Sequence, residues 1–184
     1  LARHPDAIVQ DATTARAVPV ADGLSPKVIL DLCAGHGTKS LQLARRHPDC
    51  RVIVSDTDDR RLQDLQDLSE RVENIEVMDA SAARGLRGEV DLLVLDTEMF
   101  DYTLLRTIRL DLIRPLAIEF ETKAFTMQQG AEIASLLSLY GYLCRFAPFK
   151  DPENDMLSSK RTALQYQEYG DSAYNRAYGA YNRS

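Results

Sequence analysis

Apolar and polar positions alternate along the chain in blocks whose lengths suit strands and helices in turn. A continuous apolar run is typical of a strand that is buried on both faces of a parallel sheet. Such runs predict strands over residues 28–33, 51–55, 75–78, 90–95 and 116–121. We expect these strands to form the core of the protein.

The stretches between these runs carry a helical period. A predicted helix over 58–72 places its apolar side chains on one face, at Leu62, Leu65, Leu68 and Val72. Thr126 and Gln129 predict a capping box at the start of a helix that ends near Tyr140. Further helices are expected over residues 12–18, 38–47, 80–84 and 102–110.

Two more strand-like runs, over 142–149 and 162–166, follow the last long helix, and a polar loop over 151–160 joins them. Strands joined in this way predict an antiparallel hairpin at the edge of a sheet. The alternation of strands and helices predicts an α/β fold, namely a Rossmann-like, doubly wound, mostly parallel sheet with a terminal antiparallel hairpin.

We divide the chain into a lead-in over 1–27, one domain over 28–168 and a tail over 169–184. The tail is rich in Tyr and Asn and repeats the letters AYNR at 173–176 and 180–183, and we expect it to be flexible. The chain begins at Leu1 rather than Met, so we expect an upstream segment to be missing.

Composition narrows the class of protein. Of the 184 residues, 45% are hydrophobic, which suits a globular domain, and no run reaches the roughly 20 apolar residues that a membrane span needs. The three cysteines form no metal-like pair, so we expect reduced thiols, no metal site and a cytoplasmic protein. The net charge of −6 disfavours RNA as a partner, because proteins that grip a phosphate backbone are usually basic.

The predicted strands end in acidic residues. Asp31, Asp56, Asp79 and Asp96 each stand at such an end. Ligands of open α/β sheets bind at the carboxyl ends of the strands. We therefore expect these four carboxylates to line one ligand site.

Residues 28–40, with the sequence VILDLCAGHGTKS, are the stretch around which the chain is organised. Its pattern is Asp31-x-Cys33-x-Gly35-x-Gly37, with Cys33 where a first glycine often stands. Glycines let a backbone approach a ligand closely, and the free amides of a helix start favour a carboxylate or phosphate. The loop therefore predicts a nucleotide-like cofactor, and a Walker loop is excluded because Thr38 replaces a required glycine.

Asp56 and Asp79 are candidates for binding the two ends of an adenosine. Asp56 can accept hydrogen bonds from both ribose hydroxyls, and Asp79 can accept one from the adenine amino group. The alternative for each is a helix cap. The predicted cofactor site comprises Asp31, Cys33, Ala34, Gly35, His36, Gly37, Lys39, Asp56, Thr57, Asp79, Ala80 and Asp96.

Asp96 and Glu98 are the catalytic candidates, because they follow the fourth strand, where a reacting substrate is expected. Either carboxylate can orient an acceptor hydroxyl or act as a general base, and the alternative is a pair of solvated loop acids. Glu119 and Glu121 either approach the substrate or pair with Lys123 or Arg114.

Three other side chains near the predicted site have open roles. Lys39 either meets a cofactor carboxylate or is solvated. His36 lies in the loop, where its ring can line the site, and Cys144 is interpreted as a small buried side chain rather than a nucleophile.

The first half of the chain resembles the Fmu-type RNA cytosine-5 methyltransferases. Gln10-Asp11-Ala12 and the loop VILDLCAGHGTKS are similar to that family's VQD segment and LDLCAAPGGKT loop, over roughly residues 6–96. The resemblance implies S-adenosylmethionine (SAM) as cofactor, with residues 34–39 in contact with it, Asp56 on the ribose and Asp79 on the adenine.

The resemblance ends at the catalytic positions of that family. Its members carry Pro-Cys after the fourth strand and Thr-Cys after the fifth, where one cysteine is the nucleophile. Here the corresponding letters are Asp96-Thr97-Glu98 and Glu121-Thr122-Lys123.

The second half, over about 91–158, resembles FkbM-type methyltransferases. LDTEMFDYTLLRTI is similar to their Asp-x-Glu-Gly-x-Asp/Glu motif, with Met99 in the glycine position, and RPLAIEFE is similar as well. This resemblance implies methyl transfer to a hydroxyl of a small molecule or sugar.

The sequence therefore predicts a SAM-dependent methyltransferase with a small-molecule or sugar acceptor. The enzyme alternative is an Fmu-like RNA cytosine methyltransferase. A protein that binds SAM without catalysis and acts as a scaffold is a third interpretation, and an NAD-dependent enzyme is a weaker fourth.

Overall fold

The computed structural model describes residues 17–88, 90–97, 99–122, 124–146 and 162–167. Its strands form one sheet in the order β3-β2-β1-β4-β5-β7-β6. They are β1 (Val28–Asp31), β2 (Arg51–Val54), β3 (Ile75–Val77), β4 (Leu92–Leu95), β5 (Ala117–Glu121), β6 (Tyr142–Phe146) and β7 (Thr162–Gln167). The helices are α1 (Ala17–Leu24), α2 (Thr38–Arg46), α3 (Asp59–Ser69), α4 (Ala80–Arg84), α5 (Asp101–Thr107), α6 (Leu110–Ile113) and α7 (Met127–Leu139).

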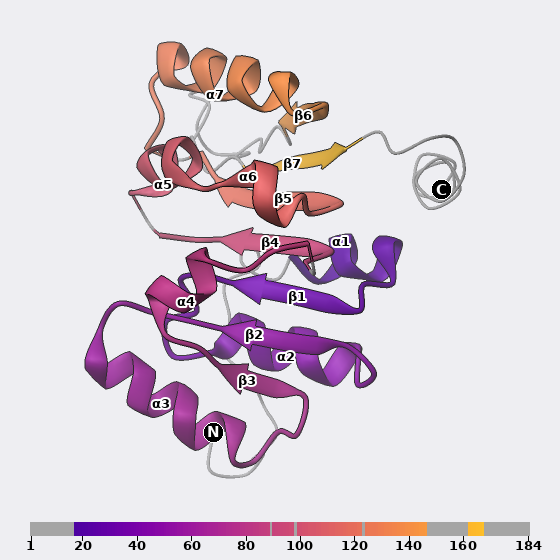
Figure 1. Ribbon diagram of the computed structural model, residues 1–184, viewed down its shortest axis with the longest axis vertical. Coiled ribbons are helices and arrows are strands. Elements are labelled where there is room, and N and C mark those ends of the chain that lie inside the picture. The colour runs from indigo at the N-terminus through magenta and orange to yellow at the C-terminus, as the bar shows by residue number, and fades with distance from the viewer. Residues whose placement is uncertain (1–16, 89, 98, 123, 147–161, 168–184) are drawn as a thin grey trace, which may run out of the picture.

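The sheet has the predicted doubly wound arrangement. Strands β1 to β5 run parallel to their neighbours, and β7 lies antiparallel between β5 and β6. The arrowheads of the parallel strands in Figure 1 all point to the same edge, which is the carboxyl edge. The predicted fold class, including the antiparallel hairpin, is confirmed.

Helices cover both faces of the sheet. Ile29, Val52 and Val94 pack on one face with α1, α2 and α3, and Leu30, Leu93 and Phe120 pack on the other with α4 to α7. Figure 1 shows α1 and α2 behind the sheet and α4, α5 and α6 in front of it. Burial on both faces is the reason that these strands are apolar throughout.

The predicted helices differ from the observed ones in two places. The helix expected over 102–110 is instead α5 and α6, because Ile108 is extended, with φ −65° and ψ 135°, and ends α5. The helix expected over 12–18 lies mostly outside the described residues, and α1 runs through Pro19 to Leu24. Proline is tolerated there because the amides of a first turn have no helical partner.

The capping box at the start of α7 is confirmed. The Thr126 hydroxyl accepts from the Gln129 amide, and the Gln129 side chain accepts from the Thr126 amide. The loop over 151–160, residues 147–149 of the sixth predicted strand and the tail over 169–184 lie outside the described residues. None of the described helices combines the length and hydropathy required to cross a bilayer.

Candidate active site

The connection between β1 and α2 is fastened to the end of β2. The Ala34 amide donates to the Ser55 carbonyl oxygen at 3.0 Å, and the Gly35 amide donates to Asp56 Oδ2 at 3.0 Å. The Gly37 amide turns back to the Ala34 carbonyl oxygen at 2.8 Å. The predicted cofactor loop is therefore held in one conformation at the carboxyl edge of the sheet.

The two glycines of this loop have different structural roles. Both have positive φ, 58° at Gly35 and 78° at Gly37. A Cβ at Gly37 would lie 2.6 Å from Leu68 Cδ2 and 2.9 Å from Leu65 Cδ2, so this glycine lets α2 begin close to α3. A Cβ at Gly35 meets nothing within 4 Å, which leaves open space for a ligand beside the backbone.

Asp56 organises the loop rather than capping a helix. Its carboxylate is buried and accepts from the amides of Gly35, Thr57 and Asp58. The residue that caps α3 is Asp58, whose side chain accepts from the amides of Arg60 and Arg61. The helix-cap alternative for Asp56 is therefore wrong. Three amides leave about one of the four lone-pair positions of this carboxylate for a further donor, and the Arg61 guanidinium faces Oδ2 at 3.6 Å.

Asp79 does cap a helix, as one of its two interpretations predicted. Its Oδ1 accepts from the amides of Ser81 and Ala82 at the start of α4, and these bonds, with one from the Ser81 hydroxyl, lower the pKa of the Asp79 carboxyl. Asp79 is exposed and Ala80 is half-buried at the end of β3. The hydrogen bond of Asp79 with the adenine amino group stays a prediction, and Oδ2 is the atom that would accept it.

His36 and Cys33 lie in the loop without features of catalytic groups. The His36 Nδ1 atom lies 2.6 Å from Asp64 Oδ2, so the exposed ring spans from the loop to α3. Burial, with the charges of Asp31 and Asp56, raises the pKa of the Cys33 thiol to about 12. Cys33 therefore stays a neutral thiol near pH 7, and its predicted part in the site is contact alone.

Lys39 is buried, and its position overturns the interpretation of a solvated side chain. Only 8% of the residue is exposed, and its Nζ donates to Asp96 Oδ2 at 2.8 Å. Asp96 is consequently an ion-pair partner inside the site rather than a solvated loop acid. This contact brings together the start of α2 and the loop that follows β4.

Asp31 lies beneath α2 and next to this ion pair. Its Oδ2 accepts from the Ser40 hydroxyl at 2.7 Å, and its buried Oδ1 has no hydrogen-bond partner. Burial raises the pKa of the Asp31 carboxyl, while the Lys39 charge and the Ser40 hydrogen bond oppose that rise. Ser40 was not among the predicted site residues, although it lies nine residues after Asp31 in the same motif.

Glu119 belongs to the same buried group, which the sequence analysis did not recognise. Arg114, one of its two expected partners, donates instead to the Asp111 carbonyl oxygen, and Lys123 lies outside the described residues. Glu119 is 4% exposed and its Oε2 has no hydrogen-bond partner. Burial raises the pKa of the Glu119 carboxyl to about 7, against the opposing charge of Lys39.

The loop after β4 is held by Asp101, a second residue to which the sequence analysis gave no role. The buried Asp101 carboxylate accepts from the Thr97 hydroxyl at 2.6 Å and from the Glu121 amide at 3.3 Å. It therefore ties the loop beside Asp96 to the end of β5. The other catalytic candidate, Glu98, lies outside the described residues.

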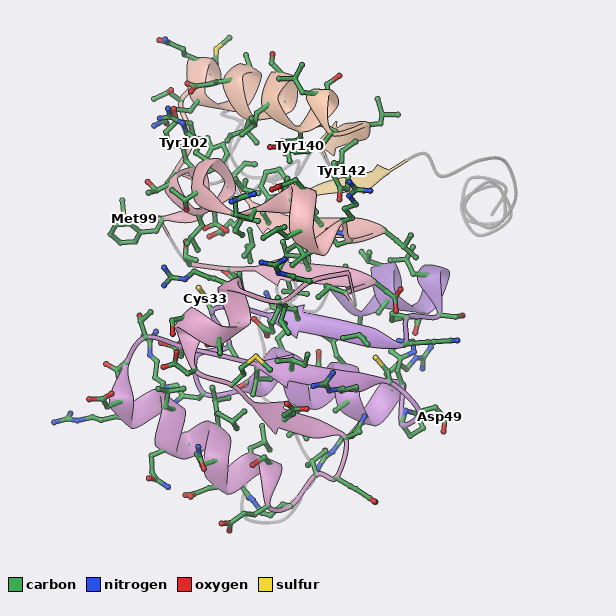
Figure 2. The ribbon with its side chains drawn as sticks, viewed as in Figure 1. Cys33, Asp49, Met99, Tyr102, Tyr140 and Tyr142 are labelled. Carbon is green, nitrogen blue, oxygen red and sulfur yellow. The ribbon has the colours of Figure 1, made fainter. Side chains whose placement is uncertain are left out.

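This loop presents two apolar side chains to solvent. Met99 is 71% exposed and Phe100 is 67% exposed. Figure 2 shows Met99 at the carboxyl edge of the sheet, the edge at which Cys33 also lies, whereas Asp49 lies at the opposite edge. The predicted acidic residues thus lie at the same edge of the sheet as the exposed Met99 and Phe100 side chains. This arrangement suits a ligand that has both polar and apolar parts.

Comparison with known proteins is informative at the level of the fold. Neither a family model nor the sequence of a curated protein matches the chain. Among solved structures, a precorrin-6y C5,15-methyltransferase from Geobacter metallireducens matches 91% of this chain and 100% of its own, at 14% identity and a TM-score of 0.61.

Two further solved structures give the same result. A methyltransferase from Geobacter sulfurreducens matches 90% of this chain and 85% of its own, at 18% identity and a TM-score of 0.63. The methyltransferase domain of bacterial CtHen1-C matches 86% of this chain and 100% of its own, at 14% identity and a TM-score of 0.64. Together with the order of the strands, these matches show that the chain has the Rossmann-like fold of class I methyltransferases.

Proposed function

We propose that the chain is a SAM-dependent methyltransferase that moves a methyl group to a hydroxyl of a small molecule or sugar. The observation that carries the proposal is the β1–α2 loop, whose Gly35 amide is held by Asp56 at the carboxyl edge of the sheet. The hydroxyl acceptor is inferred from the resemblance of residues 91–158 to FkbM-type methyltransferases.

The residues of the loop fit SAM. The open space at Gly35 admits a ligand beside the backbone, and no side chain caps the first turn of α2, whose amides favour a carboxylate. The unpartnered Asp31 Oδ1 favours a cationic or hydrogen-bond-donating group. Gly35, Asp56 and Asp79 are the residues that would hold the cofactor, which supplies a methyl group on a positively charged sulfur.

The task of the chain itself is to place the acceptor and to take its proton. Holding the hydroxyl in line with the methyl group contributes much of the rate, because the two groups no longer have to meet by diffusion. Asp96 stands at the end of β4, where its carboxylate can accept the hydroxyl proton as the new bond forms. Thr97 and Asp101 keep the adjoining loop in place.

The residues at the catalytic positions speak against the covalent cytosine mechanism of the Fmu-type enzymes. The cysteines of the chain are Cys33, Cys50 and Cys144, and none follows the fourth or fifth strand at the expected place. Cys33 is the cysteine of the cofactor loop, and its raised pKa keeps it from being a thiolate nucleophile. The net charge of −6 also disfavours an RNA acceptor.

Calorimetric titration with SAM, S-adenosylhomocysteine and NAD tests the proposal. We expect the first two ligands to bind with micromolar dissociation constants and NAD to give no heat of binding. If the folded chain binds neither SAM nor S-adenosylhomocysteine, the proposed function is wrong. Binding of NAD alone would favour a dehydrogenase instead.

Replacing each of the two loop glycines with alanine is expected to affect a different property: stability at Gly37 and SAM binding at Gly35. Gly37→Ala should lower the free energy of unfolding by about 2–3 kcal/mol, because it adds left-handed strain and crowds Leu65 and Leu68. Gly35→Ala should cost only about 1 kcal/mol but weaken SAM binding by roughly tenfold or more, since its Cβ enters the open space. Urea unfolding and calorimetry measure the two effects.

The comparison between the two variants decides the assignment of roles. If Gly35→Ala retains full SAM affinity, the open space beside Gly35 is not the cofactor site. If Gly37→Ala is as stable as the unchanged chain, the close approach of α2 to α3 does not require a glycine.

A further inference from the structure

The buried group around Lys39 contains more carboxylates than this one ammonium can neutralise. Asp31 pairs with Val94 across β1 and β4, and Val94 pairs with Glu119 across β4 and β5. Residues that pair in this way point to the same face of a parallel sheet. Asp96, the residue after β4, joins them through its hydrogen bond with Lys39. Three carboxylates therefore gather beneath the start of α2, from which Lys39 descends.

Lys39 contacts one of these carboxylates and leaves another without a partner. Its Nζ donates to Asp96, whereas Glu119 Oε2 is buried and accepts no hydrogen bond. Burial opposes the charge on Lys39, but the charges of Glu119, Asp31 and Asp96 together raise the pKa of its ammonium, and the Glu119 charge is the largest of the three. The ammonium thus stays protonated with a second carboxylate close to it.

An orphaned carboxylate of this kind has an energetic consequence. A buried polar atom without a hydrogen bond costs free energy, so a state that supplies the missing partner regains that free energy. The described His, Cys, Asp and Glu side chains form no group with the geometry to hold a metal ion. The cation whose charge acts on the Glu119 carboxyl is Lys39.

We propose that Lys39 has two alternative carboxylate partners, Asp96 in the structure described here and Glu119 when a cationic ligand engages Asp96. Glu119 is then a positioning residue, because it draws the ammonium away and leaves the Asp96 carboxylate to the ligand and to the acceptor hydroxyl. The identity of the ligand as SAM, and the role of Asp96, rest on the proposed function.

The exchange of partners is expected to release protons when the ligand binds. Glu119 faces Lys39 from α2, Asp31 from β1 and Asp96 from the loop after β4, and burial raises its pKa to about 7, close to neutral pH. An ammonium that moves against this carboxyl favours its ionised form, so the pKa falls. Protons therefore pass from Glu119 to solvent when the ligand binds near pH 7.

Calorimetry of SAM binding at pH 7, in phosphate and in Tris, measures this proton because the two buffers have different ionisation enthalpies. We expect the unchanged chain to release more protons per SAM than Glu119→Gln. Lys39→Met should release fewer protons for the same reason, because no ammonium is then present to move against Glu119. S-adenosylhomocysteine, which lacks the positive charge on sulfur, should release less than SAM.

The controls separate the inference from the proposed function. Glu70→Gln, at an exposed position after α3, should release as many protons as the unchanged chain. Thermal melting confirms that each variant is folded. Equal release from the unchanged chain and Glu119→Gln, with SAM bound to both, overturns the inference alone, whereas failure of the folded unchanged chain to bind SAM overturns the proposed function and the inference with it.

Discussion

Asp96→Asn is expected to slow methyl transfer by about 10²- to 10⁴-fold, the usual contribution of a positioned general base. Asparagine keeps the size of the side chain and still offers an oxygen to Lys39, but it cannot take a proton from an acceptor hydroxyl. The measurement is transfer of a tritiated methyl group from SAM to a panel of sugars and phenols, followed for the acceptor that the unchanged chain turns over.

Affinity for S-adenosylhomocysteine provides the control for this variant. We expect calorimetry to give nearly the same dissociation constant for Asp96→Asn as for the unchanged chain, because the loop at Gly35 does not involve Asp96 and this ligand lacks the positive charge that would engage the Asp96 carboxylate. Asp111→Asn, at an exposed position beyond the site, should keep full activity. A fully active Asp96→Asn chain would remove Asp96 from the proposed mechanism and leave Glu98 as the candidate base.

Asp56→Ala is expected to weaken SAM binding by about 100-fold, which corresponds to about 2.8 kcal/mol. The substitution removes the proposed hydrogen bond to the ribose, and charge-assisted bonds of this kind contribute about 1.5–3 kcal/mol. It also releases the Gly35 amide, which Asp56 Oδ2 holds at 3.0 Å, so the loop loses one of its two attachments to the end of β2. Titration with SAM and with S-adenosylhomocysteine measures the change.

Asp59→Ala is the matched control for this substitution. Asp59 is exposed in the first turn of α3 and contributes to neither the loop nor the end of β2. We expect its affinity for SAM to equal that of the unchanged chain. If Asp56→Ala and Asp59→Ala bind SAM equally well, the ribose contact and the anchoring role of Asp56 are both refuted.

The parallel core was predictable because burial on both faces leaves a simple trace in the sequence. The runs over 51–55 and 116–121 match β2 and β5 to within one residue. The run over 28–33 overshoots β1, since Leu32 and Cys33 remain apolar after the chain has left the sheet. Apolar letters report burial, and a buried loop looks the same as a buried strand in a single sequence.

The break between α5 and α6 was not predictable for a related reason. Residues 102–110 keep a helical spacing of apolar positions, and the extended Ile108 interrupts the helix without a Gly or Pro to announce it. Local preference is overridden there by packing against the core, in which Leu105 and Leu110 are both buried.

The candidate site was predictable one residue at a time but not as a group. The ends of the strands identify Asp31, Asp56 and Asp96 because topology alone brings such ends to one edge. The contact of Lys39 with Asp96, and the closeness of Glu119 to both, depend on the register between β1, β4 and β5 and on where α2 lies. Charge patterns along the chain suggested the sequence neighbours Arg114 and Lys123 instead.

The place of β7 between β5 and β6 has a consequence for how the protein is made. As the chain leaves the ribosome, β6 emerges before β7, yet it pairs with no strand except β7 among the described residues. Until Thr162–Gln167 arrives, β5 keeps an open edge with unpaired amides and carbonyls, which is a template for association with other chains. The edge of β5 is therefore closed only after Thr162–Gln167 has been synthesised, and a nascent chain halted before residue 162 is the species most exposed to such association.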